Sequence, residues 1–327
     1  MICLLHMGYK AIAMVIVQTV FNILTLLLNF IYCKKNLKIK MYFRKFRWGF
    51  LKEVAIYSFW IFLNVIMDRI YWSTGQFVLG AVVGTVAVAV FAVAIQLQNL
   101  YMQFSTAIAN VFLPKVTSIV TTNDDSQVIS DLFIKTGRIQ FIIMSLVLSG
   151  FIVFGRQFII LWAGPEYEQA YIISLLFFVS LLIPLIQNLG ITILQARNQM
   201  KFRSLLYITI AFVALILQIV FAKMWGGIGC AIAISGALLL GQGLVMNIYY
   251  SRKQNLDIVK FWKEIGKMSI APVVVVLCSI PVLKYVVLDS WVKLIVSILI
   301  FSVIYILAFW KASMNQYERD LLEVPLR

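Results

Sequence analysis

Polar and charged residues stand inside the second of several long apolar runs in this sequence. The stretch LNVIMDRIYWSTGQFVLG (63–80) contains Asn64, Asp68 and Arg69. In a helix, Asn64 and Asp68 share one face with Trp60 and Trp72, because residues four apart project in the same direction. Amide, carboxylate and guanidinium groups form hydrogen bonds and ion pairs, so this face is suited to a hydrated or polar interior and not to lipid.

Adjacent helical residues project about 100° apart, so Asp68 and Arg69 do not neutralise each other face to face. Asp68 would lie about 21 Å along its helix from Val54, beyond the middle of a bilayer. An ionised group at that depth costs roughly 2.5–3.5 kcal/mol on insertion scales. Each of the two residues therefore needs water or a partner on another helix.

Two further apolar runs each carry a polar seam, a line of polar residues that would share one face of a helix. The third run has Gln96, Asn99, Gln103, Thr106 and Asn110 at helical spacing, and the fifth run has Asn188, Thr192 and Gln195. Three such helices can line a hydrated cavity. The alternative is that these side chains bind neighbouring helices together, since interhelical hydrogen bonds contribute about 0.6 kcal/mol each on average.

No catalytic, metal or cofactor site is predicted. The single histidine, His6, has no companion ligands, and the four cysteines (Cys3, Cys33, Cys230, Cys278) are dispersed. The outward loop GPEYEQA (164–170) is short, and its glutamates fit a solvated turn. A membrane enzyme would need catalytic groups on larger loops, so we do not expect an enzyme.

The composition predicts an all-α polytopic membrane protein. Hydrophobic residues make up 62% of the 327 residues and charged residues only 13%, against about 25% charged residues in soluble domains. Apolar blocks of about 20 residues are long enough to cross a bilayer, and helices satisfy their own backbone there. Nine spans are expected, at 11–32, 54–79, 86–113, 139–162, 171–194, 204–225, 228–250, 269–288 and 291–310.

The formal charge of +15 is concentrated between the spans on one side. Of the 28 lysines and arginines, 22 fall in segments 33–53, 114–138, 195–203, 251–268 and the C-terminal tail. Basic loops stay in the cytoplasm, which predicts a cytoplasmic C-terminus and, with nine spans, an outside N-terminus. The positive charge thus indicates which loops lie in the cytoplasm, and we expect no nucleic-acid partner.

Four segments carry a resemblance to a known family. They are FWIFLNVIMDRIYWSTGQFVLGAVVGTVAVAVFAVAIQLQNLYMQFSTAIANVFLPKVTSI (59–119), LWAGPEYEQA (161–170), ILQARNQMKFR (193–203) and WGGIGCAIA (225–233). In this order they resemble the C-terminal portion of Wzx-type flippases for O-antigen and capsule repeat units, in the superfamily that includes MATE exporters. The first segment is the most specific, and the likeness covers about 50–310.

The resemblance implies a domain organisation. Residues 1–53 would hold the last helix of a missing N-lobe and a basic cytoplasmic loop. Residues 54–250 would form a MATE-like six-helix C-lobe, and residues 251–327 two extra transmembrane helices and a cytoplasmic tail. The chain would then be a fragment of a larger transporter.

The function implied by the resemblance is translocation of an undecaprenyl-diphosphate-linked oligosaccharide across the bacterial inner membrane, in contact with membrane lipids and other polysaccharide assembly proteins. Asn64, Gln96, Asn99 and Gln103 would bind sugar hydroxyls, Trp60 and Trp72 sugar faces, and Arg69 phosphate. Asp68 would carry a coupling proton or sodium ion; no other cofactor is implied.

The set of expected cavity residues is Trp60, Asn64, Asp68, Arg69, Trp72, Gln96, Asn99, Gln103, Asn110 and Asn188. A drug or cation exporter, a lipid II flippase and a non-transporting truncated product are the alternatives.

Overall fold

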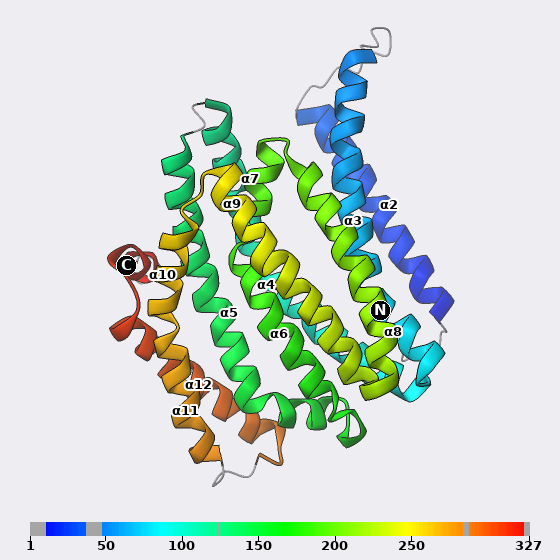
Figure 1. Cartoon of the computed structure of the whole chain (residues 1–327), viewed down its shortest axis with the longest axis vertical. Coiled ribbons are helices and arrows are strands. Elements are labelled where there is room, and N and C mark those ends of the chain that lie inside the picture. The colour runs from blue at the N-terminus through cyan, green and yellow to red at the C-terminus, as the bar shows by residue number, and fades with distance from the viewer. Residues whose placement is uncertain (1–10, 37–47, 123–124, 284–287, 324–327) are drawn as a thin grey trace. The chain divides into compact units, whose positions relative to one another are not determined.

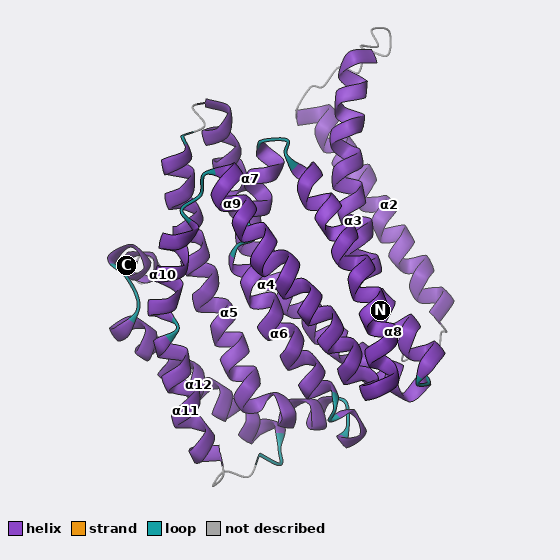
Figure 2. Ribbon diagram, in the orientation of Figure 1, coloured by secondary structure: helices purple, strands orange, loops and turns teal. Residues whose placement is uncertain are grey.

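The computed structural model describes residues 11–36, 48–122, 125–283 and 288–323. All regular structure in these ranges is helical (Figure 2). Several of the helices are long and apolar enough to cross a membrane. The prediction of an all-α polytopic membrane protein is confirmed.

The chain divides into two compact units between Ala55 and Ile56. The first unit contains α2 (Ala11–Asn36), which is apolar along most of its length and ends with Lys34 and Lys35. Positive charge in the last turn of a helix interacts favourably with the helix dipole. The first unit also contains the first turns of α3 (Trp48–Val82).

The second unit holds the rest of α3 and the remaining helices. They are α4 (Thr85–Thr122), α5 (Ser126–Trp162), the 3-10 turn η1 (Pro165–Tyr167), α6 (Ala170–Ile186), α7 (Leu189–Ala196), α8 (Met200–Leu238), the π-helix η2 (Leu239–Val245), α9 (Met246–Gln254), α10 (Ile258–Met268), α11 (Ile270–Leu283), α12 (Trp291–Ala312) and α13 (Gln316–Glu323).

Helix α6 is central to this unit. It packs against α4, α5 and α8, while α5 also packs against α11 and α12 (Figure 1). Large side chains such as Phe91 of α4 and Phe177 of α6 are fully buried and in ring contact between these helices. Helix α5 therefore joins the helices around α6 to the pair α11–α12.

The segment Met200–Gln254 contains two spans. Its 55 residues pass as one apolar segment, but Trp225 and Gly226 have non-helical backbone angles, with φ of +56° at Gly226. Beyond this break the chain runs back along itself, because a Cβ on Gly229 would lie 2.0 Å from the carbonyl oxygen of Phe221 and one on Gly241 would lie 1.9 Å from Ile210. Figure 1 shows this reversal within α8, whose second part leads through η2 into α9.

The described residues contain seven helical segments long and apolar enough to cross a membrane, and α6 with α7 forms an eighth, bent by 44°. One of the seven, Met200–Gln254, covers two of the nine predicted spans, 204–225 and 228–250, on either side of the break at Gly226. The predicted end of the eighth span, at 288, lies beyond residues 284–287, which are outside the described ranges.

The loops assigned from charge are shorter than predicted. Segment 114–138 was expected to be a loop, yet α4 continues to Thr122 and α5 begins at Ser126, where Asp125 accepts a hydrogen bond from the Gln127 amide at 2.8 Å. Segment 251–268 contains α10. These helices extend beyond the apolar runs because capping and packing stabilise turns that hydropathy alone does not detect.

Candidate functional site

A polar cavity of about 710 Å³ lies in the second unit between α3, α4, α6, α7 and α8. This volume falls in the usual range for a small-molecule site, roughly 300–1,000 Å³. Seven of the residues expected from the sequence line the cavity: Asn64, Asp68, Arg69, Trp72, Asn99, Gln103 and Asn188. The structure therefore brings together side chains from the second, third and fifth apolar runs.

Asn64 ties α3 to α8 at the wall of the cavity. Its side-chain amide donates to the Ser204 hydroxyl and to the carbonyl of Trp60, the latter at 3.2 Å. Its side-chain oxygen accepts a hydrogen bond from Nη1 of Arg203 at 2.8 Å. Asn64 is buried, so these bonds satisfy a polar group that would otherwise be costly to hold in the bundle.

Arg203 was expected to lie in a cytoplasmic loop, and this prediction was wrong. It lies in the first turn of α8, is 8% exposed and lines the cavity. Its Nη2 donates to the Tyr207 hydroxyl at 3.3 Å, and its guanidinium lies 4.6 Å from the centre of the Tyr207 ring. The sequence did not predict Arg203 as a cavity residue, because a basic residue beside an apolar run usually marks the cytoplasmic end of a span. Its spacing of four from Tyr207 was the available clue.

Asp68 and Arg69 both line the cavity. Asp68 is half-buried and Arg69 is exposed. The charge of Arg203 on α8 acts on Asp68 more strongly than that of the adjacent Arg69 does. The acid and the base at the centre of the second span thus face a polar space, and Asp68 has its strongest charged neighbour on another helix.

The break between α6 and α7 brings a second group of amides to the cavity. Asn188 follows the end of α6, one turn after Pro184, and donates to the Ser105 hydroxyl of α4 at 3.2 Å. Gln140 of α5 donates to the Ser105 carbonyl at 3.3 Å, and the Ser105 hydroxyl donates to the Leu185 carbonyl at 2.6 Å. Asn188 therefore has both of the roles considered from the sequence, since it binds helices together and lines the cavity.

Three of the expected residues do not line this cavity. Trp60 accepts hydrogen bonds at its carbonyl from Asn64 and Ser204, and its ring lies 5.8 Å from the Lys201 ammonium. Gln96 and Asn110 are exposed at the two ends of the α4 seam. The seam runs over four helical turns, whereas lining residues on α4 extend only from Asn99 to Thr106, so its ends project beyond the cavity.

The described residues contain no cluster of three or more His, Cys, Asp or Glu side chains that could hold a metal ion. Further polar lining comes from Thr106, Gln195 and Tyr207. The polar part of the cavity wall is thus made of amides, hydroxyls, two guanidinium groups and one carboxylate, and apolar side chains such as Leu181 and Leu185 form the rest. Such a wall can bind hydroxyl-rich and anionic groups through hydrogen bonds and charge.

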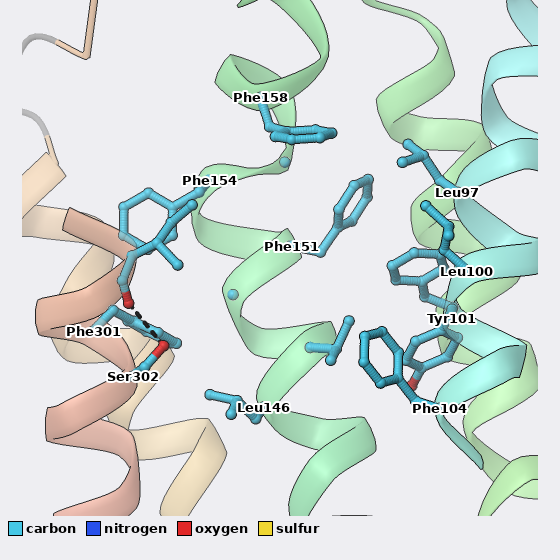
Figure 3. Close-up of a pocket in the computed structure, with 15 residues that line it drawn as sticks. Leu97, Leu100, Tyr101, Phe104, Leu146, Phe151, Phe154, Phe158, Phe301 and Ser302 are labelled. Carbon is cyan, nitrogen blue, oxygen red and sulfur yellow. Dashed lines mark hydrogen bonds between the residues drawn. The ribbon is translucent and has the colours of Figure 1, made fainter. Parts of the chain in front are cut away.

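A second cavity has the opposite character. It measures about 380 Å³ and is lined by apolar and aromatic residues of α4, α5, α6 and α12, among them Phe151, Phe154 and Phe301 (Figure 3). Its polar groups are already paired, because the Tyr101 hydroxyl donates to the Met144 carbonyl at 3.1 Å and the Ser302 hydroxyl to the Ile298 carbonyl at 2.8 Å. This space suits hydrocarbon and offers no site for a polar ligand.

The fold and the polar cavity define a polytopic α-helical membrane protein that encloses hydrogen-bonding and charged side chains between its spans. The chain matches the model of a family described as "polysaccharide biosynthesis protein" over residues 1–172, more than half of its length. It belongs to this polysaccharide biosynthesis family. No curated protein and no solved structure matches the sequence.

Proposed function

We propose that this protein translocates a lipid-linked oligosaccharide, the repeat unit of a surface polysaccharide, across the bacterial inner membrane. In this proposal it acts as a Wzx-type flippase by alternating access, and the cargo is linked to undecaprenyl diphosphate. The observation that carries the proposal is the polar cavity between apolar spans, in a chain that belongs to a polysaccharide biosynthesis family.

The cavity has the chemistry that a sugar needs. Asn99 and Gln103 of α4 and Asn188 beside α7 present amides that both donate and accept hydrogen bonds, as sugar hydroxyls do. The Trp72 ring can pack against an apolar sugar face. A cavity for a hydrophobic drug needs only a few polar groups, whereas this one presents many amide, hydroxyl and charged groups beside its apolar residues, which favours the sugar cargo.

The charged groups fit the rest of the cargo. Arg69 and Arg203 supply positive charge for the diphosphate, because guanidinium groups pair well with phosphate. The polyprenyl tail remains among the lipid chains outside the polar cavity. Asp68, the carboxylate among the lining residues, carries the coupling proton or sodium ion, as intramembrane carboxylates do in other transporters.

The proposal is tested by deleting the gene and restoring it as variants in the organism that carries it. Cell-surface polysaccharide and accumulated lipid-linked repeat unit are measured together. We expect the N99L/Q103L double variant to lower surface polysaccharide about tenfold or more, because each lost hydrogen bond is worth about 1 kcal/mol in the cavity. The lipid-linked precursor should accumulate.

Gln157→Leu is the matched control. It also replaces an amide by leucine, but on α5, a helix with no residue among those lining the cavity. It should leave polysaccharide unchanged at equal expression. Wild-type polysaccharide from the double variant at wild-type expression would refute the proposed function.

A further inference from the structure

Arg203 is a buried cation without a direct counter-ion. Its guanidinium is bonded to two neutral side chains, Asn64 and Tyr207. No carboxylate of the described residues forms an ion pair with it. A charge held away from water is costly unless it is paired, so the structure holds Arg203 in a position that favours the arrival of an anion.

The Arg203 side chain also has unused hydrogen-bonding capacity. Its Nε is buried and has no hydrogen-bond partner. The residue is more than nine-tenths buried and still belongs to the wall of the cavity. Asn64 and Tyr207 fix the guanidinium by two of its nitrogens, which leaves the third available to a group that enters the cavity when neighbouring side chains shift.

Asp68 is a source of compensating charge for Arg203. It is the carboxylate among the residues that line the cavity, and it interacts electrostatically with Arg203 more strongly than with Arg69. It remains too distant for an ion pair with Arg203. Asp68 therefore stabilises the guanidinium through space without occupying its unused donor, Nε.

We propose that Arg203 is the principal phosphate-binding residue of the cavity and that Asp68 acts as a built-in competitor for it. When the cargo binds, its phosphate replaces Asp68 as the negative charge that stabilises the Arg203 guanidinium. This inference rests on the proposed function and adds to it the residue that holds the diphosphate. It also gives Asp68 a role in release, because the negative charge of Asp68 weakens phosphate binding and so helps the cargo to leave.

Two kinds of molecule in a membrane carry phosphate: the diphosphate-linked cargo and the bulk anionic phospholipids. We assign the site to the diphosphate. Two adjacent phosphate groups can engage Arg203 and Arg69 together, whereas the single phosphodiester of a phospholipid engages one of them.

The experiment measures binding of inorganic pyrophosphate to the purified full-length chain in a neutral detergent by titration calorimetry. We expect R203Q to weaken binding about tenfold or more, because charge-assisted hydrogen bonds are lost. D68N should strengthen binding by about threefold or more, because a nearby negative charge is removed. R156Q is the matched control and should bind as the wild type does, since Arg156 is exposed and paired with Glu168 at 2.6 Å.

A gain of affinity in D68N cannot come from misfolding, so the proposal stays testable even where R203Q folds poorly. Unchanged or weaker binding in D68N overturns the competitor role of Asp68. Wild-type binding in R203Q overturns the role of Arg203. Displacement of pyrophosphate by an equal concentration of phosphatidylglycerol overturns the assignment to a diphosphate.

The binding readout is independent of the transport readout. If R203Q and D68N change pyrophosphate binding as expected while N99L/Q103L leaves surface polysaccharide unchanged, the anion site stands and the proposed function falls. If N99L/Q103L abolishes polysaccharide while R203Q binds pyrophosphate normally, the proposed function stands and the inference about Arg203 falls.

Discussion

At the scale of single residues, polar side chains in these apolar helices fall into two groups. Asn64 and Ser105 are buried and bond to other helices. Asn99 and Gln103 are exposed toward the cavity. The difference between them arises from the neighbouring helices, which fill the space around the first group and leave it open around the second.

Asn64→Leu tests the first group. The substitution removes the acceptor for Arg203 and a donor to Ser204, so a buried charge and a buried hydroxyl lose a partner. We expect a loss of stability of about 1–3 kcal/mol, seen as a lower midpoint of thermal unfolding in detergent. Asn110→Leu, at an exposed position of α4, should leave the midpoint unchanged. Equal midpoints for Asn64→Leu and wild type would show that these bonds contribute nothing.

The sequence predicted part of this site. Asp68, Arg69 and the α4 amides stood out because polar groups are rare in long apolar runs. Arg203 could not be recognised in the same way, since it stands where Lys201 and Arg197 also stand, beside a run and not within it. Its role depends on the tilt and packing that bring α8 against Asn64, and no spacing rule in a single helix contains that information.

At the scale of elements, the apolar helices were predictable because a membrane span needs about 20 apolar residues. Their ends were less so. Arg138 was assigned to a cytoplasmic loop, but it lies within α5 and is buried. Its Nε is 2.5 Å from Glu318 of α13, Nη1 is 2.6 Å from Glu264 of α10, and Nη2 donates to the Ser313 carbonyl at 3.1 Å. One guanidinium thus joins α5, α10, α13 and the end of α12.

Arg138→Met should loosen this junction. Glu318 is 3% exposed, and removing one partner of a buried ion pair typically costs about 3–5 kcal/mol because the other charge is left uncompensated. We expect a markedly lower midpoint of thermal unfolding and faster proteolytic removal of the C-terminal segment from α13 onward. Stability and proteolysis are both measured on the purified chain.

Arg156→Met is the control for this junction. Its ion pair with Glu168 is exposed, and exposed pairs contribute about 0–1 kcal/mol. It should change neither measurement appreciably. If Arg138→Met and Arg156→Met behave alike, the buried junction does not hold α13 in place.

At the scale of the whole molecule, the connections of the second unit gather at opposite ends of its helices. The turns at Gly84 and Gly226 lie together, since a Cβ on Gly226 would be 4.0 Å from Val83. The connections around Arg197 and Asn255 also lie together, because Arg197 donates to the Gln254 carbonyl at 3.1 Å. The part of α8 before its break separates these two groups, because α8 begins at Met200, just after Arg197, and breaks at Gly226. Figure 1 shows α8 along this direction. The second group carries the positive charge, with Arg252 and Lys253 closing α9.

The orientation in the membrane follows from this separation and is the last prediction. Positive charge near span ends stays in the cytoplasm, so the end with Lys253 should be inside and the end with Glu166 outside. In a variant without its four natural cysteines, we expect Glu166→Cys to react with a membrane-impermeant maleimide in intact spheroplasts. Lys253→Cys should react only after lysis. The opposite pattern would invert the topology. Reaction of both before lysis would place them on one side and would contradict the three spans predicted between them, at 171–194, 204–225 and 228–250.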